Sequence, residues 1–133
     1  DLFTDGRSPK AAELQAEPRL ELCWLLPKAR CQFRLRGNRL RLNAEAEAQE
    51  RRRHWHQLSP GARALWGWPP PGAPFDPAAA FPSELADGSP LPECFELLRV
   101  QISQVELLEL KGHPHQRRRW RADQGWAEHW LNP

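Results

Sequence analysis

The stretch CQFRLRGNRLRL, residues 31–42, decides which fold to expect for this chain. Apolar and basic residues alternate along it, which is typical of a β-strand with one apolar face. The Gly37-Asn38 pair in its middle is a strong signal for a two-residue hairpin turn. We therefore predict a hairpin about this pair. The arginines that would then face each other are Arg36 with Arg39 and Arg34 with Arg41.

Four arginines on one face of a hairpin need a source of negative charge, because like charges directly across a strand pair are destabilising. Three sources stay open: acidic side chains from elsewhere in the fold, a partner chain, or an anionic ligand. Gln32 would share this face with Arg34, and an amide among guanidinium groups suits an anion or the edge of a heteroaromatic ring. The plainer alternative, an exposed face paired with Glu or Asp, is the one the residues alone favour.

The rest of the chain alternates short strands with short helices, and its hairpins favour an antiparallel α+β or barrel fold. Ser8, Asn43 and Ser59 are good helix N-caps. Proline excludes regular structure from the loop at 68–77. The predicted strands are residues 2–5, a buried strand at 21–27, a long strand at 94–110, and a last hairpin about Gly125 with Trp120 and Trp126 on its strands. The predicted helices follow Ser8, span the run from Asn43 to about residue 58, and cover 61–66.

Composition limits the functions to consider. The length of 133 residues predicts one domain, residues 1–133, and 19 basic against 17 acidic residues argue against nucleic acid as a partner. Three scattered cysteines indicate reduced thiols, and with no apolar run of membrane-spanning length we expect a cytoplasmic protein without membrane contact. The chain starts beside a strand end, so we expect the amino-terminal strands of the natural domain to be missing.

The segment TDGRSPK at residues 4–10 could hold phosphate. Free backbone N–H groups at a helix start favour anions, and Arg7, Ser8 and Lys10 surround this one. An ordinary capped helix with solvated charges is the alternative, and the residues alone favour it.

Other chemistries have less support. The run RRRW at 117–120 could stack on nucleic-acid bases, but the near-zero net charge argues against that interpretation. The cysteines and histidines lack the spacing of a zinc site, so we predict no metal. His54 and His56 flank Trp55 on a helix and should point apart. No hydrolase motif is present.

Five segments in order resemble the pyridoxamine 5′-phosphate oxidase family, and more closely its FMN-binding, oxidase-related branch. They are FTDGRSPKAAEL, ELCWLLPKARCQFRLRG, RHWHQLSPGARALWGWPPPG, FELLRVQISQVELLELKG and RRRWRADQGWAEHWLNP, and together they cover essentially the whole chain. The resemblance implies a mainly β, α+β fold: an antiparallel split β-barrel of the FMN-binding type with a few short helices. It also implies a homodimer with FMN at the subunit interface.

The resemblance also implies which residues bind the cofactor. Thr4, Ser8 and Lys10 match positions that hold the flavin phosphate, and Phe3 belongs to the same segment. The residues implied for the ring, the ribityl chain and the charge beside the ring are Gln32, Arg34 and Arg119.

Departures from the family pattern limit the functional prediction. Leu108 stands where the oxidases place a tryptophan, and His115 and Arg117 stand near the positions of their substrate-gripping arginine and histidine. We therefore expect an FMN-dependent oxidoreductase of unknown substrate and electron acceptor, whose catalytic residues the sequence leaves unknown. The alternative is a non-catalytic dimeric protein that binds flavin or another anion and has lost oxidase activity.

Overall fold

The computed structural model describes all 133 residues, 1–133. The chain divides into two compact units. The first, here called the helical unit, comprises Asp1–Glu17 and Leu40–Arg99, and the second, the sheet unit, comprises Pro18–Arg39 and Val100–Pro133. The prediction of a single domain stays a prediction.

Strands and short helices alternate along the chain, as predicted. The strands are β1 (Leu2–Asp5), β2 (Arg19–Leu26), β3 (Cys31–Arg39), β4 (Phe95–Leu98), β5 (Val100–Glu109), β6 (Gln116–Arg121) and β7 (His129–Leu131). The α-helices are α1 (Pro9–Ala16), α2 (Ala44–Gln57) and α3 (Pro60–Ala64), and the 3₁₀ turns are η1 (Leu65–Gly67) and η2 (Ala122–Gln124). The proline-rich loop predicted at 68–77 contains no helix or strand.

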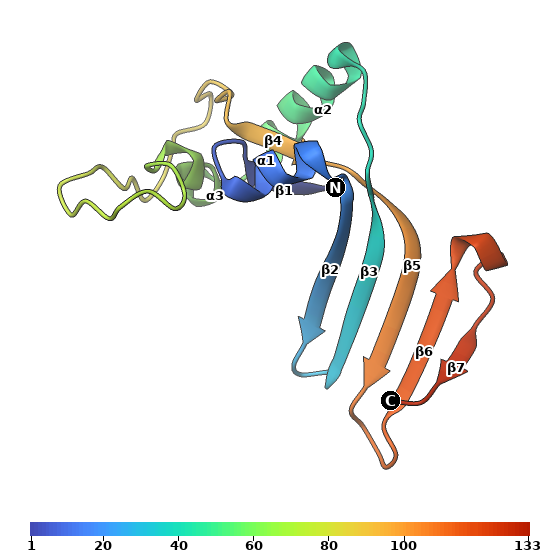
Figure 1. Ribbon diagram of the computed structural model, residues 1–133. Coiled ribbons are helices and arrows are strands. Elements are labelled where there is room, and N and C mark those ends of the chain that lie inside the picture. Colours follow the sequence, from blue (N-terminus) through green and yellow to red (C-terminus); the bar gives the residue numbers. More distant parts are fainter. The chain divides into compact units, whose positions relative to one another are not determined.

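All strand pairs are antiparallel. In the helical unit β1 pairs with β4, and in the sheet unit five strands follow the order β2-β3-β5-β6-β7, side by side in Figure 1. Neither sheet closes on itself as a barrel. The fold is therefore an antiparallel α+β fold.

The predicted hairpin about Gly37-Asn38 is wrong. β3 runs straight through this pair from Cys31 to Arg39, and its register with β5 shifts between Arg36 and Gly37. A Cβ on Gly37 would lie 2.2 Å from the Gln101 backbone oxygen, so only glycine permits this approach. Glycine in a strand often marks a bulge or a close backbone contact. Gly37 is such a glycine, and it does not form a turn.

The hairpin that the structure contains joins β2 to β3 through residues 27–30. The Arg30 N–H donates to the Pro27 carbonyl at 3.0 Å, and Arg30 adopts a φ of 50°. This pairing places β2 beside the arginines of β3, with Glu21 across from Arg36. The first of the three possible sources of negative charge, an acid from elsewhere in the fold, is thus present.

The predicted strand at 94–110 is two strands. It breaks at Arg99, and β4 pairs with β1 while β5 pairs with β3 and β6. The last hairpin forms, but Trp126 lies in its turn with a φ of 59° and not on a strand as predicted. Trp120 is on β6.

The helices begin where the capping signals place them. The side chains of Ser8, Asn43 and Ser59 accept hydrogen bonds from backbone N–H groups of α1, α2 and α3. Each cap satisfies a donor that the helix itself leaves free. In the helical unit Trp55 and Phe95 are almost fully buried, with ring centroids 5.3 Å apart.

The sheet unit leaves large apolar side chains exposed. Trp24 and Trp130 are each 60% exposed and Leu25 is 58% exposed. The prediction of a buried strand at 21–27 is therefore wrong for the isolated chain. No helix in the structure combines the length and the apolar character that crossing a membrane requires.

Candidate ligand-binding face

One face of the five-stranded sheet gathers most of the polar chemistry of the sheet unit. Because residues directly paired across antiparallel strands point to the same side, the register brings alternate residues of β3, β5 and β6 together. We call this surface the basic face. Its residues are Gln32, Arg34, Arg36, Gln104, Glu106, Leu108, Arg117, Arg119 and Arg121.

Two carboxylates neutralise part of this face. Glu21 forms ion pairs with Arg34, at 2.9 Å, and with Arg36. The hydrogen bond from Arg36 holds the pKa of the Glu21 carboxyl below its ordinary value, and the same contact raises the pKa of Arg36. Both arginines are about half exposed, so this is a solvated surface pair of modest strength.

Glu106 is the other carboxylate, and it is buried, with 5% of its surface exposed. Its Oε2 accepts from Arg117 Nη2 at 2.6 Å and from Arg117 Nε at 3.2 Å. Its Oε1 accepts from the Gln104 side-chain amide at 2.9 Å. Both oxygens are therefore held, as a buried charge requires.

Arg119 has no such partner. It lies directly across from Glu106 on one side and His129 on the other, but its Nε is buried without a hydrogen-bond acceptor. Gln32 lies on the same face, across from Leu108 on β5. A buried donor without an acceptor is costly, so this face favours an added acceptor or anion.

A hollow of about 330 Å³ opens on the basic face. It is lined by Gln32, Arg34, Glu106, Leu108, Arg117 and Pro133. The lining joins two apolar side chains to an amide, a carboxylate and two guanidinium groups, a composition that suits a flat ligand with polar edges. A neighbouring hollow of about 470 Å³ extends along residues 111–117 and 130–133 and includes His113 and His115.

At the start of α1, two of the groups predicted to bind phosphate already have partners within the chain. The Ser8 hydroxyl donates to the Asp5 carbonyl at 2.7 Å and accepts from the Ala11 N–H at 3.3 Å, so it caps the helix. Arg7 folds back on the Asp5 carboxylate at 2.6 Å, and this contact lowers the pKa of Asp5. Lys10 is exposed, which leaves its ammonium group available to an anion.

Phe3 and Thr4 lie on β1 before this helix. The Phe3 ring stacks on Phe95 with centroids 5.2 Å apart and contacts His54 at 5.0 Å. Thr4 is 7% exposed. The Phe3 side chain therefore packs within the helical unit.

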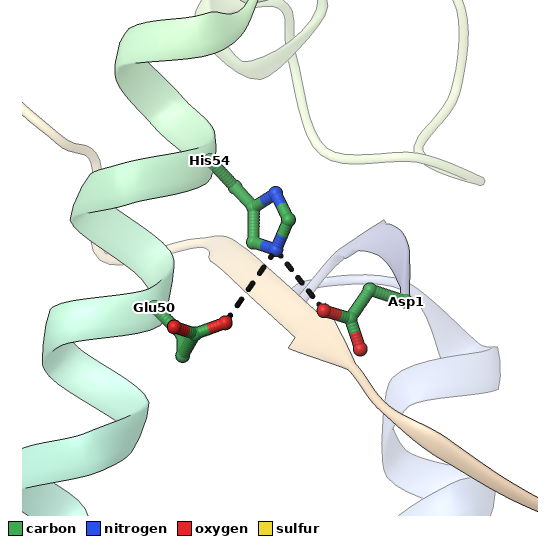
Figure 2. A group of neighbouring side chains, drawn as sticks. All are labelled: Asp1, Glu50 and His54. Carbon is green, nitrogen blue, oxygen red and sulfur yellow. Dashed lines mark hydrogen bonds and ion pairs between the residues drawn. The ribbon is translucent and has the colours of Figure 1, made fainter.

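The structure also joins Asp1, Glu50 and His54, a cluster that the sequence did not indicate (Figure 2). His54 Nε2 lies 3.0 Å from Asp1 Oδ2 and 3.8 Å from Glu50 Oε2. Arg99 contacts both carboxylates, at 2.7 and 2.8 Å, so arginine already balances their charge. The pKa of the His54 imidazole is lowered, mainly because burial disfavours its charged form.

The predicted cofactor-binding residues thus fall into two sets. Gln32, Arg34 and Arg119 share the basic face of the sheet unit, whereas Phe3, Thr4, Ser8 and Lys10 belong to the helical unit. Glu106 and Gln104 were missed by the sequence analysis. Their signal was the alternation of polar residues in SQVELLE, which places Gln104 and Glu106 on one side of a strand.

Comparison with known proteins gives one consistent result. Residues 1–42 match a family described as pyridoxamine 5′-phosphate oxidase, FMN-binding domain. Pyridoxine/pyridoxamine 5′-phosphate oxidase 2 of Arabidopsis thaliana is 32% identical over 114 residues, which cover 81% of this chain and 57% of that protein. The chain therefore spans a little over half the length of this curated relative.

A solved structure extends the match to nearly the whole chain. The pyridoxamine 5′-phosphate oxidase-related, FMN-binding protein from Nostoc punctiforme is 34% identical, with a TM-score of 0.81. The match covers 98% of this chain and 71% of that one. This likeness confirms the predicted fold class.

Proposed function

Because the chain belongs to the pyridoxamine 5′-phosphate oxidase-related, FMN-binding family, we propose that it binds FMN and acts as an oxidoreductase. The observation that carries this proposal is the unpaired Arg119. Its buried Nε lacks an acceptor on the face that also carries Gln32. A flavin ring carries carbonyl and nitrogen acceptors along its pyrimidine edge, so these donors fit the cofactor.

In this proposal the residues of the chain bind and orient the cofactor. Gln32 and Arg119 donate hydrogen bonds to the ring, and Arg34 addresses its edge or the ribityl chain. In the helical unit, Lys10 and the first N–H groups of α1 offer an anion a cation and free donors, with Thr4 and Ser8 beside them. Because the Ser8 hydroxyl already donates its hydrogen to the Asp5 carbonyl, it has no hydrogen left to donate to a phosphate, and the exposed Lys10 supplies the charge.

FMN, when bound, supplies hydride and electron transfer that no side chain here can perform. The contribution of the chain is electrostatic. Arg119 places a cation on the basic face, where it would stabilise negative charge that develops on the ring. Glu106 is bound to Arg117 and does not neutralise Arg119. No side chain is assigned as a general acid or base.

A second candidate function is binding of flavin without catalysis. Arg117, near the position where the oxidases grip their substrate, is held by Glu106 at 2.6 Å. Leu108 lines the hollow where the resemblance expects tryptophan. Both observations favour a member of the family that keeps the cofactor and has lost the vitamin B6 substrate.

We also propose that the protein works as a cytoplasmic homodimer with flavin at the subunit interface. Trp24, Leu25 and Trp130 support a partner, because each exposes more than half of its surface. They lie on the two edge strands of the sheet, β2 and β7, where a second chain would cover them. Light scattering on the purified protein would give twice the chain mass for a dimer, and a single chain mass would contradict it.

The proposal is tested by thermal unfolding with FMN or riboflavin present. A ligand that binds only the folded state raises the melting temperature. We expect FMN to raise it and riboflavin, which lacks the phosphate, to raise it less. The oxidised protein with FMN bound should then be mixed with pyridoxine 5′-phosphate, and a separate chemically reduced sample should be exposed to oxygen. Reoxidation by oxygen without turnover of the vitamin would favour a different substrate, and no thermal effect of FMN would contradict the proposal.

A further inference from the structure

Glu106 is an unusual residue for the centre of a cation-rich surface. It lies in the middle of β5, across from Arg34 on β3 and from Arg119 on β6. Among the carboxylates of the chain it is the one that is buried. Each of its oxygens has an assigned partner: Arg117 binds Oε2 by two hydrogen bonds, and Gln104 binds Oε1.

This arrangement decides which arginine is neutralised. Glu106 faces Arg119 directly in the register, yet its carboxylate binds Arg117, two residues earlier on β6. Gln104 donates to the other carboxylate oxygen, Oε1, at 2.9 Å. The result is one fixed arginine in the wall of the hollow and one unpaired arginine beside it.

We propose that Glu106 is a positioning residue of the ligand site, which fixes the Arg117 guanidinium in the wall of the hollow and leaves Arg119 free for the ligand. This inference rests on the proposed function, since FMN is the ligand that it concerns. Glu106 need not touch the cofactor. It acts through Arg117, whose two-point contact restricts the guanidinium plane as well as its position.

Charge and positioning predict opposite results when Glu106 is replaced by glutamine. If the carboxylate acted only through its charge, its loss would leave the basic face more positive and would strengthen binding of the anionic FMN. If it positions Arg117, the Glu106→Gln protein should bind FMN more weakly. The direction of the change therefore separates the two roles.

The experiment is a set of equilibrium FMN titrations, followed by quenching of flavin fluorescence, on the wild-type protein and three variants. We expect Glu106→Gln to raise the Kd about tenfold, the size of one charge-assisted hydrogen bond. Arg117→Gln should raise it by a similar factor. The double variant should bind no more weakly than Arg117→Gln alone, because residues that act as one unit are not additive.

Glu109→Gln provides a matched control. Glu109 lies on the same strand and forms an ion pair with Arg118, the next arginine of β6, on the opposite side of the sheet. Its replacement removes the same charge and the same type of contact. We expect its Kd to stay within about twofold of wild type. Thermal unfolding without FMN should be recorded for every variant, so that a loss of folding is recognised.

The outcomes separate this inference from the proposed function. Wild-type protein that fails to bind FMN overturns the proposed function and this inference with it. Wild-type protein that binds FMN, together with a Glu106→Gln protein that binds as tightly or more tightly, overturns the inference alone. Equal losses in Glu106→Gln and Glu109→Gln would also overturn it, since they would reflect a general effect of lost ion pairs.

Discussion

Glu106 and Arg119 face each other directly across β5 and β6, and they do not form an ion pair. The carboxylate binds Arg117 at 2.6 Å, and the Arg119 Nε stays buried without an acceptor. A sheet that contains both an acid and a base in register, yet leaves the base unpaired, has a cation ready for an external anion.

Arg119→Gln should weaken FMN binding without loss of stability. The change removes an unpaired cation, so the Kd should rise about tenfold or more, while the melting temperature of the protein without FMN should stay the same or rise slightly. Arg121→Gln is the control, because Arg121 is bound to Asp123 at the end of the same strand. Fluorescence titration would refute the assignment if both variants bound FMN alike.

Arg34→Ala should weaken binding of FMN or of the second subunit. Arg34 lines the hollow beside Gln32, whereas Arg39 ends the same strand away from the hollow. Arg39→Ala should therefore have little effect on either. The measurements are an FMN titration and sedimentation at several protein concentrations. If both variants behaved like the wild-type protein, the arginines of β3 would be a solvated basic surface without a binding role.

Gly37→Ala should destabilise the protein by about 1–3 kcal/mol, the range for forcing extra atoms into a packed site. The new Cβ would lie 2.2 Å from the Gln101 oxygen, which is backbone and cannot move aside alone. Gly61→Ala is the control, since its nearest neighbour is at 3.7 Å and alanine favours the helix α3. Urea unfolding of both variants tests this, and an unaffected Gly37→Ala protein would contradict the bulge.

Glu50 should make stability depend on pH in the acid range. Hydrogen bonds from Arg53 and then Arg99 lower the pKa of its carboxyl to about 2 from an ordinary value of 4.5. A folded-state pKa below the unfolded one stabilises the fold above pH 4.5, and this contribution is lost as the pH falls from 4.5 towards 2.

The Glu50→Gln variant tests this sign directly. It should show a shallower loss of stability between pH 4.5 and 2 than the wild-type protein, as measured by thermal unfolding at each pH. Salt should reduce the difference in part, because the Glu50 side chain is still about a quarter exposed. Identical slopes for the two proteins would show that the Arg53 and Arg99 contacts do not persist in solution.

Much of the fold could be predicted from local signals. Ser8, Asn43 and Ser59 mark helix starts because their side chains satisfy donors within three residues, a property that sequence alone contains. The Gly37-Asn38 signal failed, because a turn and a bulge both need a residue without a Cβ. Whether Gly37 forms a turn or a bulge depends on β5, the strand that packs against it. That strand lies more than sixty residues further along the chain.

The candidate site was less predictable for the same reason. Alternation placed Gln32 and Arg34 on one face, and the family resemblance pointed to Arg119. Neither could show that Glu106 binds Arg117 and not the arginine it faces. That choice depends on side-chain contacts across β5 and β6 and on Gln104, which holds the second oxygen.

The most direct test of the central claim is an equilibrium titration of the purified protein with FMN, followed by flavin fluorescence and by calorimetry. We expect saturable binding of one FMN per chain, and we expect Arg119→Gln to raise the Kd about tenfold. A wild-type protein that shows no saturable binding of FMN would contradict it.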